Sequence, residues 1–181
     1  MKRILIATCF FLAPAIAPAQ LKLDHLDRLA AKASETVNLT LDGSLLQMAA
    51  KFLDDDSDSA SVKKLVSGLK GIQIRSFEFK NAGEYQPDDV DAIRNQLRDP
   101  DWKRIVQTRS KAEGDSDIYL KTEGGRITGL AIISAEPKEL TIVSIDGVID
   151  EAGMRKLAGN FGIPSHLGKA PTSKKSKEKD E

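Results

Sequence analysis

Four strand-like segments follow one another in the last third of this 181-residue chain: Trp102–Arg109, Asp117–Glu123, Arg126–Ala135 and Glu139–Asp146. Gly124-Gly125 supplies the positive φ angles that a two-residue hairpin turn requires, and Pro137 fixes a φ suited to the next turn. The middle of the sheet is therefore expected to be antiparallel. Leu130–Ile133 and Thr141–Ile145 are nearly continuous apolar runs, which are typical of strands covered on both faces.

Apolar residues recur at helical spacing in the first half of the chain. The spacing predicts a helix over residues 22–33, a second helix capped by Asp42, and a third stopped by Gly71. A fourth helix is expected to begin at Pro87, and a fifth at Asp150. These helices are expected to pack against the sheet.

Two further strands are expected among these helices. Apolar and polar residues alternate over residues 37–41, as in a short strand. A longer strand begins at Ile72, but its apolar residues change from one face to the other before Phe77. Because a regular strand keeps a period of two, this change predicts a bulge near Arg75 and Ser76.

The first 19 residues have the pattern of a secretory signal peptide. Lys2 and Arg3 precede an apolar run, and Ala17-Pro18-Ala19 is the small-x-small motif that a signal peptidase requires. Cleavage after Ala19 and a periplasmic or secreted location are therefore predicted. The alternative is a lipoprotein anchored through Cys9, but Thr8 is the wrong residue before a lipidated cysteine.

Composition limits the chemistry of the rest. The only cysteine falls in the leader, which excludes disulfides and cysteine nucleophiles from the mature chain. Loss of Lys2 and Arg3 from 27 basic and 27 acidic residues gives the mature chain a net charge of −2, so nucleic acid is not expected as a partner. No stretch after the leader reaches the roughly 20 apolar residues of a transmembrane helix. Residues 168–181 form a Lys- and Ser-rich charged tail that is expected to be disordered.

The prediction for fold is a single α+β domain over residues 20–167. It has a mainly antiparallel sheet of about five to six strands with helices packed against it.

The motifs of this domain resemble a known family. They are Leu69-Lys70-Gly71-Ile72-Gln73-Ile74, the hairpin from Ile118 to Leu130, and the segment from Ile142 to Asp150. They are similar to those of the bacterial domain of unknown function 4252 family, over roughly Leu41 to Gly162. The resemblance implies an exported bacterial protein, and it brings no established activity or catalytic residues.

Two acidic segments were considered as ion sites. Within Asp54–Asp58, the residues Asp54, Asp56 and Asp58 stand at alternate positions, as at the start of an EF-hand loop, but Ser59 replaces the glycine and Leu65 replaces the bidentate glutamate. The preferred interpretation is a solvated connector. Glu113, Asp115 and Asp117 form a second cluster beside a turn. Whether either segment binds an ion stays open.

Catalytic patterns are weak. Ser61 and Ser67 each stand three residues before a lysine, as in penicillin-binding enzymes, but the companion motifs are poor and the chain is too short for that fold. His25 and His166 stand alone, whereas a zinc site normally takes at least three protein ligands. No catalytic, cofactor-binding or metal-binding residue is therefore assigned, and the protein is not expected to be an enzyme.

The functional prediction is a non-catalytic interaction module that binds an envelope protein. Trp102, Lys103 and Arg104 are the candidate partner surface, because this basic strand resembles a protected sheet edge and Trp102 suits an aromatic anchor. The alternative is a purely structural role, in which Trp102 belongs to the core. A periplasmic carrier of an apolar small molecule or lipid is the second function, and a hydrolase is a distant third. Oligomeric state is not predicted.

Overall fold

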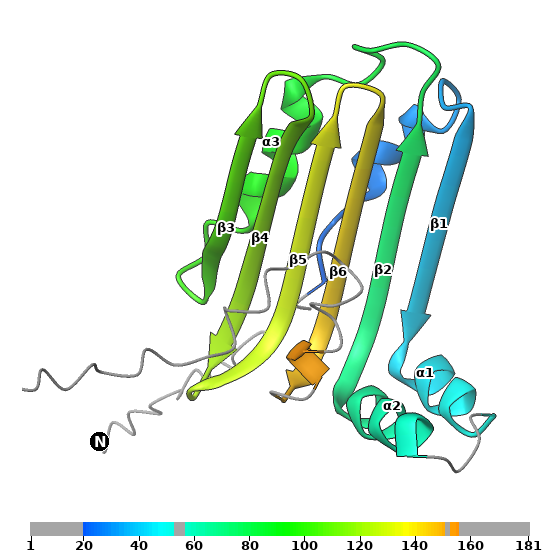
Figure 1. Cartoon of the computed structure of the whole chain (residues 1–181), viewed down its shortest axis with the longest axis vertical. Helices are drawn as coiled ribbons and strands as arrows, with labels where there is room; N and C mark the ends of the chain where they lie inside the picture. Colours follow the sequence, from blue (N-terminus) through cyan, green and yellow to red (C-terminus); the bar gives the residue numbers. More distant parts are fainter. Residues whose placement is uncertain (1–19, 53–56, 151–152, 156–181) are drawn as a thin grey trace, which may run out of the picture.

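The computed structural model describes residues 20–52, 57–150 and 153–155. These residues form one six-stranded antiparallel sheet in the order β1-β2-β6-β5-β4-β3 (Figure 1). The strands are β1 (Glu35–Asp42), β2 (Leu69–Glu78), β3 (Trp102–Ser110), β4 (Gly114–Glu123), β5 (Arg126–Glu136) and β6 (Glu139–Ile149). The predicted α+β fold with a mainly antiparallel sheet is confirmed.

Short turns explain most of this strand order. Gly124 and Gly125 have φ values of 57° and 75°, and they join β4 to β5 as the sequence predicts. The chain reverses again at Pro137 and Lys138 to pair β5 with β6. The pairing of β2 with β6 is long-range, and it attaches the β1–β2 pair to the C-terminal strands. β1 and β3 are therefore the two edges of the sheet.

One face of the sheet, the α3 face, is covered by the 3-10 helix η1 (Asp24–Leu29) and by α3 (Pro87–Gln96). Leu26, Leu29 and Ile93 are fully buried there against strand residues that include Phe77 and Ile133. Asp89 joins the two helices, because its carboxylate accepts from the Arg28 side chain and from the Gln86 backbone N–H.

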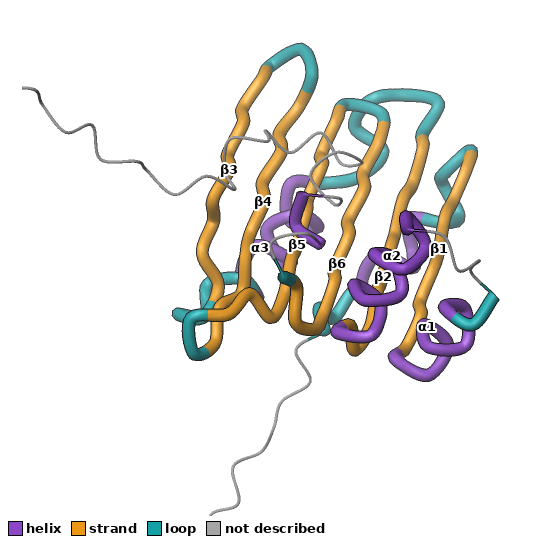
Figure 2. Tube along the Cα trace, turned by 60° about the horizontal axis from the view of Figure 1, so that its bottom comes forward, coloured by secondary structure: helices purple, strands orange, loops and turns teal. Residues whose placement is uncertain are grey.

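The opposite face, the α1 face, lies under α1 (Gly43–Ala50) and α2 (Ser57–Gly68) at one end of the sheet. Figure 2 shows these two helices in front of the strands while α3 lies behind them. Leu46 of α1 belongs to a second buried cluster with strand residues such as Leu130 and Val143. Both faces of the central strands are thus apolar, which accounts for the continuous apolar runs of β5 and β6.

The predicted cap of α1 is confirmed. Asp42 is its N-cap residue, and its Oδ1 accepts from the Leu45 N–H at 2.9 Å. The hydrogen bonds from Ser44 and Leu45 lower the pKa of Asp42 below its usual value, because they favour the ionised carboxylate.

The predicted α-helix over residues 22–33 is wrong. The chain forms the shorter 3-10 helix η1 there, and Ala30 follows it in a turn. The buried residues Leu23, Leu26 and Leu29 stand three apart. This spacing matches the three residues per turn of a 3-10 helix, so it brings all three side chains onto the sheet.

The predicted bulge near Arg75 and Ser76 is also wrong. The register of β2 with both neighbours is continuous from Gly71 to Glu78, and the irregularity lies between Leu69 and Gly71. Ile72 packs on the α1 face and Phe77 on the α3 face. The apparent change of phase arises because each face of a regular strand has its own apolar neighbours.

Several predictions concern residues outside the described part of the chain. These are the leader of residues 1–19, most of the acidic segment Asp54–Asp58, and the charged tail of residues 168–181. Of the expected final helix, the structure describes residues 153–155, which are helical. The domain limits of residues 20 and 167 stay predictions.

Candidate functional site

A carboxylate buried between α3 and the β3 edge organises the charged residues of the α3 face. Asp117 of β4 has 0% of its surface exposed. Arg94 of α3 donates from Nε to Asp117 Oδ2 at 2.9 Å, and Arg109 of β3 donates from Nη2 to Oδ1 at 3.0 Å. Nη1 of Arg104 lies 3.6 Å from Oδ1. One aspartate therefore faces three guanidinium groups from two different elements.

Asp115 extends this network toward the end of β4. It lies two residues before Asp117 and therefore on the same face of the strand. Its Oδ2 is 3.4 Å from Arg94 Nη2 and 3.3 Å from Arg109 Nε. Burial alone would lower the pKa of Arg94, but the hydrogen bonds and negative charges of Asp117 and Asp91 outweigh it and raise this pKa. Arg94 is thus firmly cationic.

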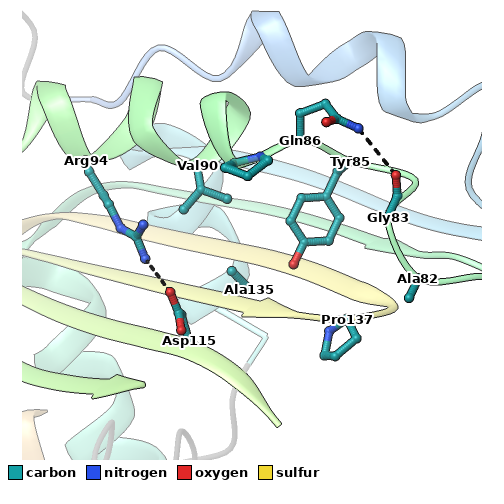
Figure 3. A pocket seen from close by; sticks show the side chains of 10 residues that line it. Ala82, Gly83, Tyr85, Gln86, Val90, Arg94, Asp115, Ala135 and Pro137 are labelled. Atoms are coloured by element: carbon teal, nitrogen blue, oxygen red, sulfur yellow. Dashed lines mark hydrogen bonds and ion pairs between the residues drawn. The ribbon is translucent and has the colours of Figure 1, made fainter. Parts of the chain in front are cut away.

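Two hollows open on either side of Arg94 along α3. The first has a volume of about 490 Å³, and Figure 3 shows Arg94 and Asp115 facing each other there while the Tyr85 ring lies between Val90 and Pro137. The Tyr85 hydroxyl donates to the backbone carbonyl of Glu136 at 2.5 Å. Burial, followed by the charges of Asp115 and Glu136, raises the pKa of the Tyr85 phenol. Its proton is therefore held at neutral pH.

The second hollow, which we name the arginine groove, has a volume of about 570 Å³. It lies between α3 and strands β3 and β4. Its lining includes two aromatic rings and four charged groups: Trp102, Tyr119, Asp91, Arg94, Arg98 and Arg104. Three arginines face one aspartate in this lining, and Asp117 lies beneath them, so the groove keeps an excess of positive charge.

The comparisons with known proteins give a family. Residues 31–157 match the family model described as Domain of unknown function (DUF4252). The chain belongs to this family. The resemblance expected from the sequence is therefore confirmed. No curated protein and no solved structure matches the chain. The matched residues of the DUF4252 domain include all six strands, α3 and every residue of the arginine groove.

The structure separates the three candidate residues of the partner surface. β3 is an edge strand, as expected, and Trp102 and Arg104 both line the arginine groove of the DUF4252 domain. Lys103 lies on the α1 face, since its partner in the register is Leu120. Trp102 is half-buried and packs against the core of the α3 face, while its role as an anchor for a partner stays a prediction.

Arg94, Arg98 and Asp117 were not recognised as site residues from the sequence. The sequence places Asp117 in an acidic cluster at the start of a strand, and the structure adds that its carboxylate is buried and bonded to arginines. Part of this network could have been predicted from the β3–β4 hairpin, because its register places Arg109 directly opposite Asp115. Oppositely charged residues on facing positions of a hairpin indicate a cross-strand pair.

The other motifs give no additional site in the described residues. Ser67 donates its hydroxyl to the carbonyl of Lys64 at 2.7 Å, and His25 Nε2 lies 3.2 Å from the carbonyl of Asp89. His166 lies outside the described residues. Within residues 20–52, 57–150 and 153–155 there is no cluster of three or more potential metal ligands. None of the helices described there has the length and apolar character to cross a membrane.

Proposed function

We propose that this protein is an exported, non-catalytic interaction module, and that its arginine groove binds an acidic segment of an envelope protein. The observation that carries the proposal is the buried Asp117, which binds Arg94 and lies close to Arg104, two arginines that line the groove. Guanidinium groups recognise carboxylates through paired hydrogen bonds. Groups already fixed before binding lose less entropy when a partner arrives.

Trp102 and Arg98 complete the argument for a protein partner. Trp102 is half-buried in the groove wall, and aromatic and arginine side chains commonly supply most of the binding energy of interfaces. Arg98 is exposed at the end of α3 and lies outside the Asp117 network, so it is accessible to an acidic partner. The carrier alternative gains no support from these hollows, because charged groups line both of them.

Export itself predicts a defined N-terminus. The protein expressed in a bacterial host should be recovered from the periplasm or medium with Gln20 as its first residue, because Ala17-Pro18-Ala19 is the expected cleavage motif. Intact-mass measurement of the purified protein checks this. A retained leader, or a lipid attached to Cys9, would contradict the prediction.

The groove proposal predicts that Arg98→Glu weakens partner binding at least tenfold. The substitution places a negative charge against the acidic partner. Juxtaposed like charges at an interface cost several kcal/mol, and each ~1.4 kcal/mol is a tenfold change in affinity. The experiment captures partners from the native envelope on the immobilised protein, and then measures the affinity of the captured protein by titration.

Lys103→Glu is the matched control. It makes the same change of net charge on an exposed residue, but on the α1 face. We expect the control to bind the same partner with nearly unchanged affinity, and both variants to keep the parent melting temperature. Equal loss of binding in the two variants would mean that net charge, and not the groove, governs association.

A further inference from the structure

The two edges of the sheet differ in how they are protected from pairing with another strand. β3 has a register shift between Arg104 and Val106, and its exposed residues include Lys103, Arg104 and Arg109. Bulges and basic side chains both discourage strand addition. β1 has neither: its register with β2 is unbroken, and residues 36–41 are uncharged. Residues 35–40 are all exposed.

Exposed apolar side chains occur on this unprotected edge strand and on the segment that follows it. Of the seven large apolar residues that are exposed in the described part of the chain, five lie between residues 37 and 52: Val37, Leu39, Leu45, Met48 and Phe52. Val37 and Leu39 are on the α1 face, because Leu39 pairs with Ile74 of that face. Met48 is 56% exposed and Phe52 is 83% exposed. Exposed apolar side chains on an edge strand, such as Val37 and Leu39, indicate an interaction surface.

We propose that a second copy of this chain occupies the edge, with the two β1 strands antiparallel around a two-fold axis. The axis then stands perpendicular to the sheet, so the α1 faces of both copies lie on the same side. Residues that are opposite each other in an antiparallel pair share a face. The result is a continuous sheet with six strands from each copy.

The sequence of β1 is complementary to itself in this arrangement. With the axis at Leu39, Val37 is opposite Leu41 of the second copy and Asn38 is opposite Thr40. With the axis at Asn38, Val37 is opposite Leu39 and Thr36 is opposite Thr40. In the first register, over residues 37–41, apolar side chains pair with apolar ones and neutral polar side chains pair with neutral polar ones; in the second the same holds for residues 36–40, and Leu41 is opposite Glu35. No like charges meet within residues 36–41 in either register.

The protected β3 edge explains why assembly would stop at two copies. Pairing of β1 with β3 would leave an unpaired edge at each end and produce an open-ended fibre. The bulge and basic residues of β3 oppose that mode, whereas the two-fold pairing of β1 closes on itself. The arginine groove lies at the other edge of each copy, so the dimer is independent of the groove and would present two of them.

The test is engineered disulfide formation in the full-length expressed protein. Every variant carries Cys9→Ser, so that the introduced cysteine is the only thiol. Residues at a two-fold axis between antiparallel strands have Cα atoms about 4.5–5.5 Å apart, within the range of disulfides. Either Leu39→Cys or Asn38→Cys should therefore form a covalent dimer rapidly on mild oxidation. Ile105→Cys is the matched control on β3, since Ile105 and Leu39 are both 36% exposed.

Solution mass gives the second measurement. Sedimentation of the Cys9→Ser protein should give twice the monomer mass, and Leu39→Lys should give the monomer mass with an unchanged circular dichroism spectrum, because residue 39 is exposed in the single chain. A monomeric parent protein would overturn the proposal. So would crosslinking at position 105 that is as fast as the faster of positions 38 and 39, or a dimer that persists in a folded Leu39→Lys variant.

Discussion

Replacement of Asp117 by alanine should lower the free energy of unfolding by about 3 kcal/mol, the lower end of the cost of breaking a buried ion pair. The substitution removes the carboxylate that accepts from Arg94 and Arg109, and it leaves their charges without this partner. The cost is at the lower end because the Arg94 and Arg109 side chains are 21% and 38% exposed, so water can partly solvate them. In a domain of this size the melting temperature should fall by roughly 6–12 °C.

Asp115→Ala is the control for this prediction. Asp115 contacts the same two arginines, but its side chain is 35% exposed. Ion pairs that reach solvent contribute about 0–1 kcal/mol, so this variant should lose no more than that. Urea unfolding with an unchanged m-value is the measurement for both variants. Similar losses in the two would contradict the central role of Asp117.

A stable Asp117 network also matters for the groove. The aspartate fixes Arg94 and faces Arg104, and both of these arginines line the arginine groove. A folded Asp117→Ala protein should therefore bind the captured envelope partner more weakly, even though Asp117 itself is buried. This links the stability of the site to the preorganisation that the proposed function requires.

The sequence predicted the elements of the fold better than their long-range pairing. Gly124-Gly125 and the strand-like segments on either side of it are local signals, and they predicted the β4–β5 hairpin correctly. The pairing of β2 with β6 joins residues about 70 positions apart in the chain, such as Ile72 and Ile145. Periodicity within a strand carries no information about such a partner. The unprotected character of β1 emerges only when the strand order shows that it is an edge.

The candidate site was only partly predictable for a related reason. Trp102 and Arg104 stood out because they belong to a basic strand, whereas Arg94 lies on α3 and its role depends on packing of that helix over β4. Charged residues are usually exposed, so an aspartate in a strand is first interpreted as solvated. The burial of Asp117 results from the helix that covers it, and no local pattern of the sequence reports that contact.

The family signature also has a structural explanation in the contact between β2 and β6. Gly147 pairs with Leu69 where the register of these strands is irregular. Its φ is 131°, a conformation that side chains of L-residues rarely adopt. A Cβ atom on Gly147 would lie 2.4 Å from the carbonyl oxygen of Gly68 and 2.5 Å from the Cα of Leu69. The glycine therefore allows two backbones to approach closely at this point.

Gly147→Ala should consequently lower the free energy of unfolding by about 4 kcal/mol or more, because it combines backbone strain with a collision against main-chain atoms that cannot rotate away. The strands must separate locally, which breaks the pairing that attaches β1 and β2 to the rest of the sheet. Urea unfolding measures the effect. Gly124→Ala is the control, since Gly124 also has a positive φ but nothing lies within 4 Å of its added Cβ. It should lose only about 1–2 kcal/mol, the cost of the left-handed backbone. Equal losses of stability in the two variants would contradict this explanation. They would mean that only the backbone conformation requires glycine at position 147, and that the close contact of β2 with β6 does not.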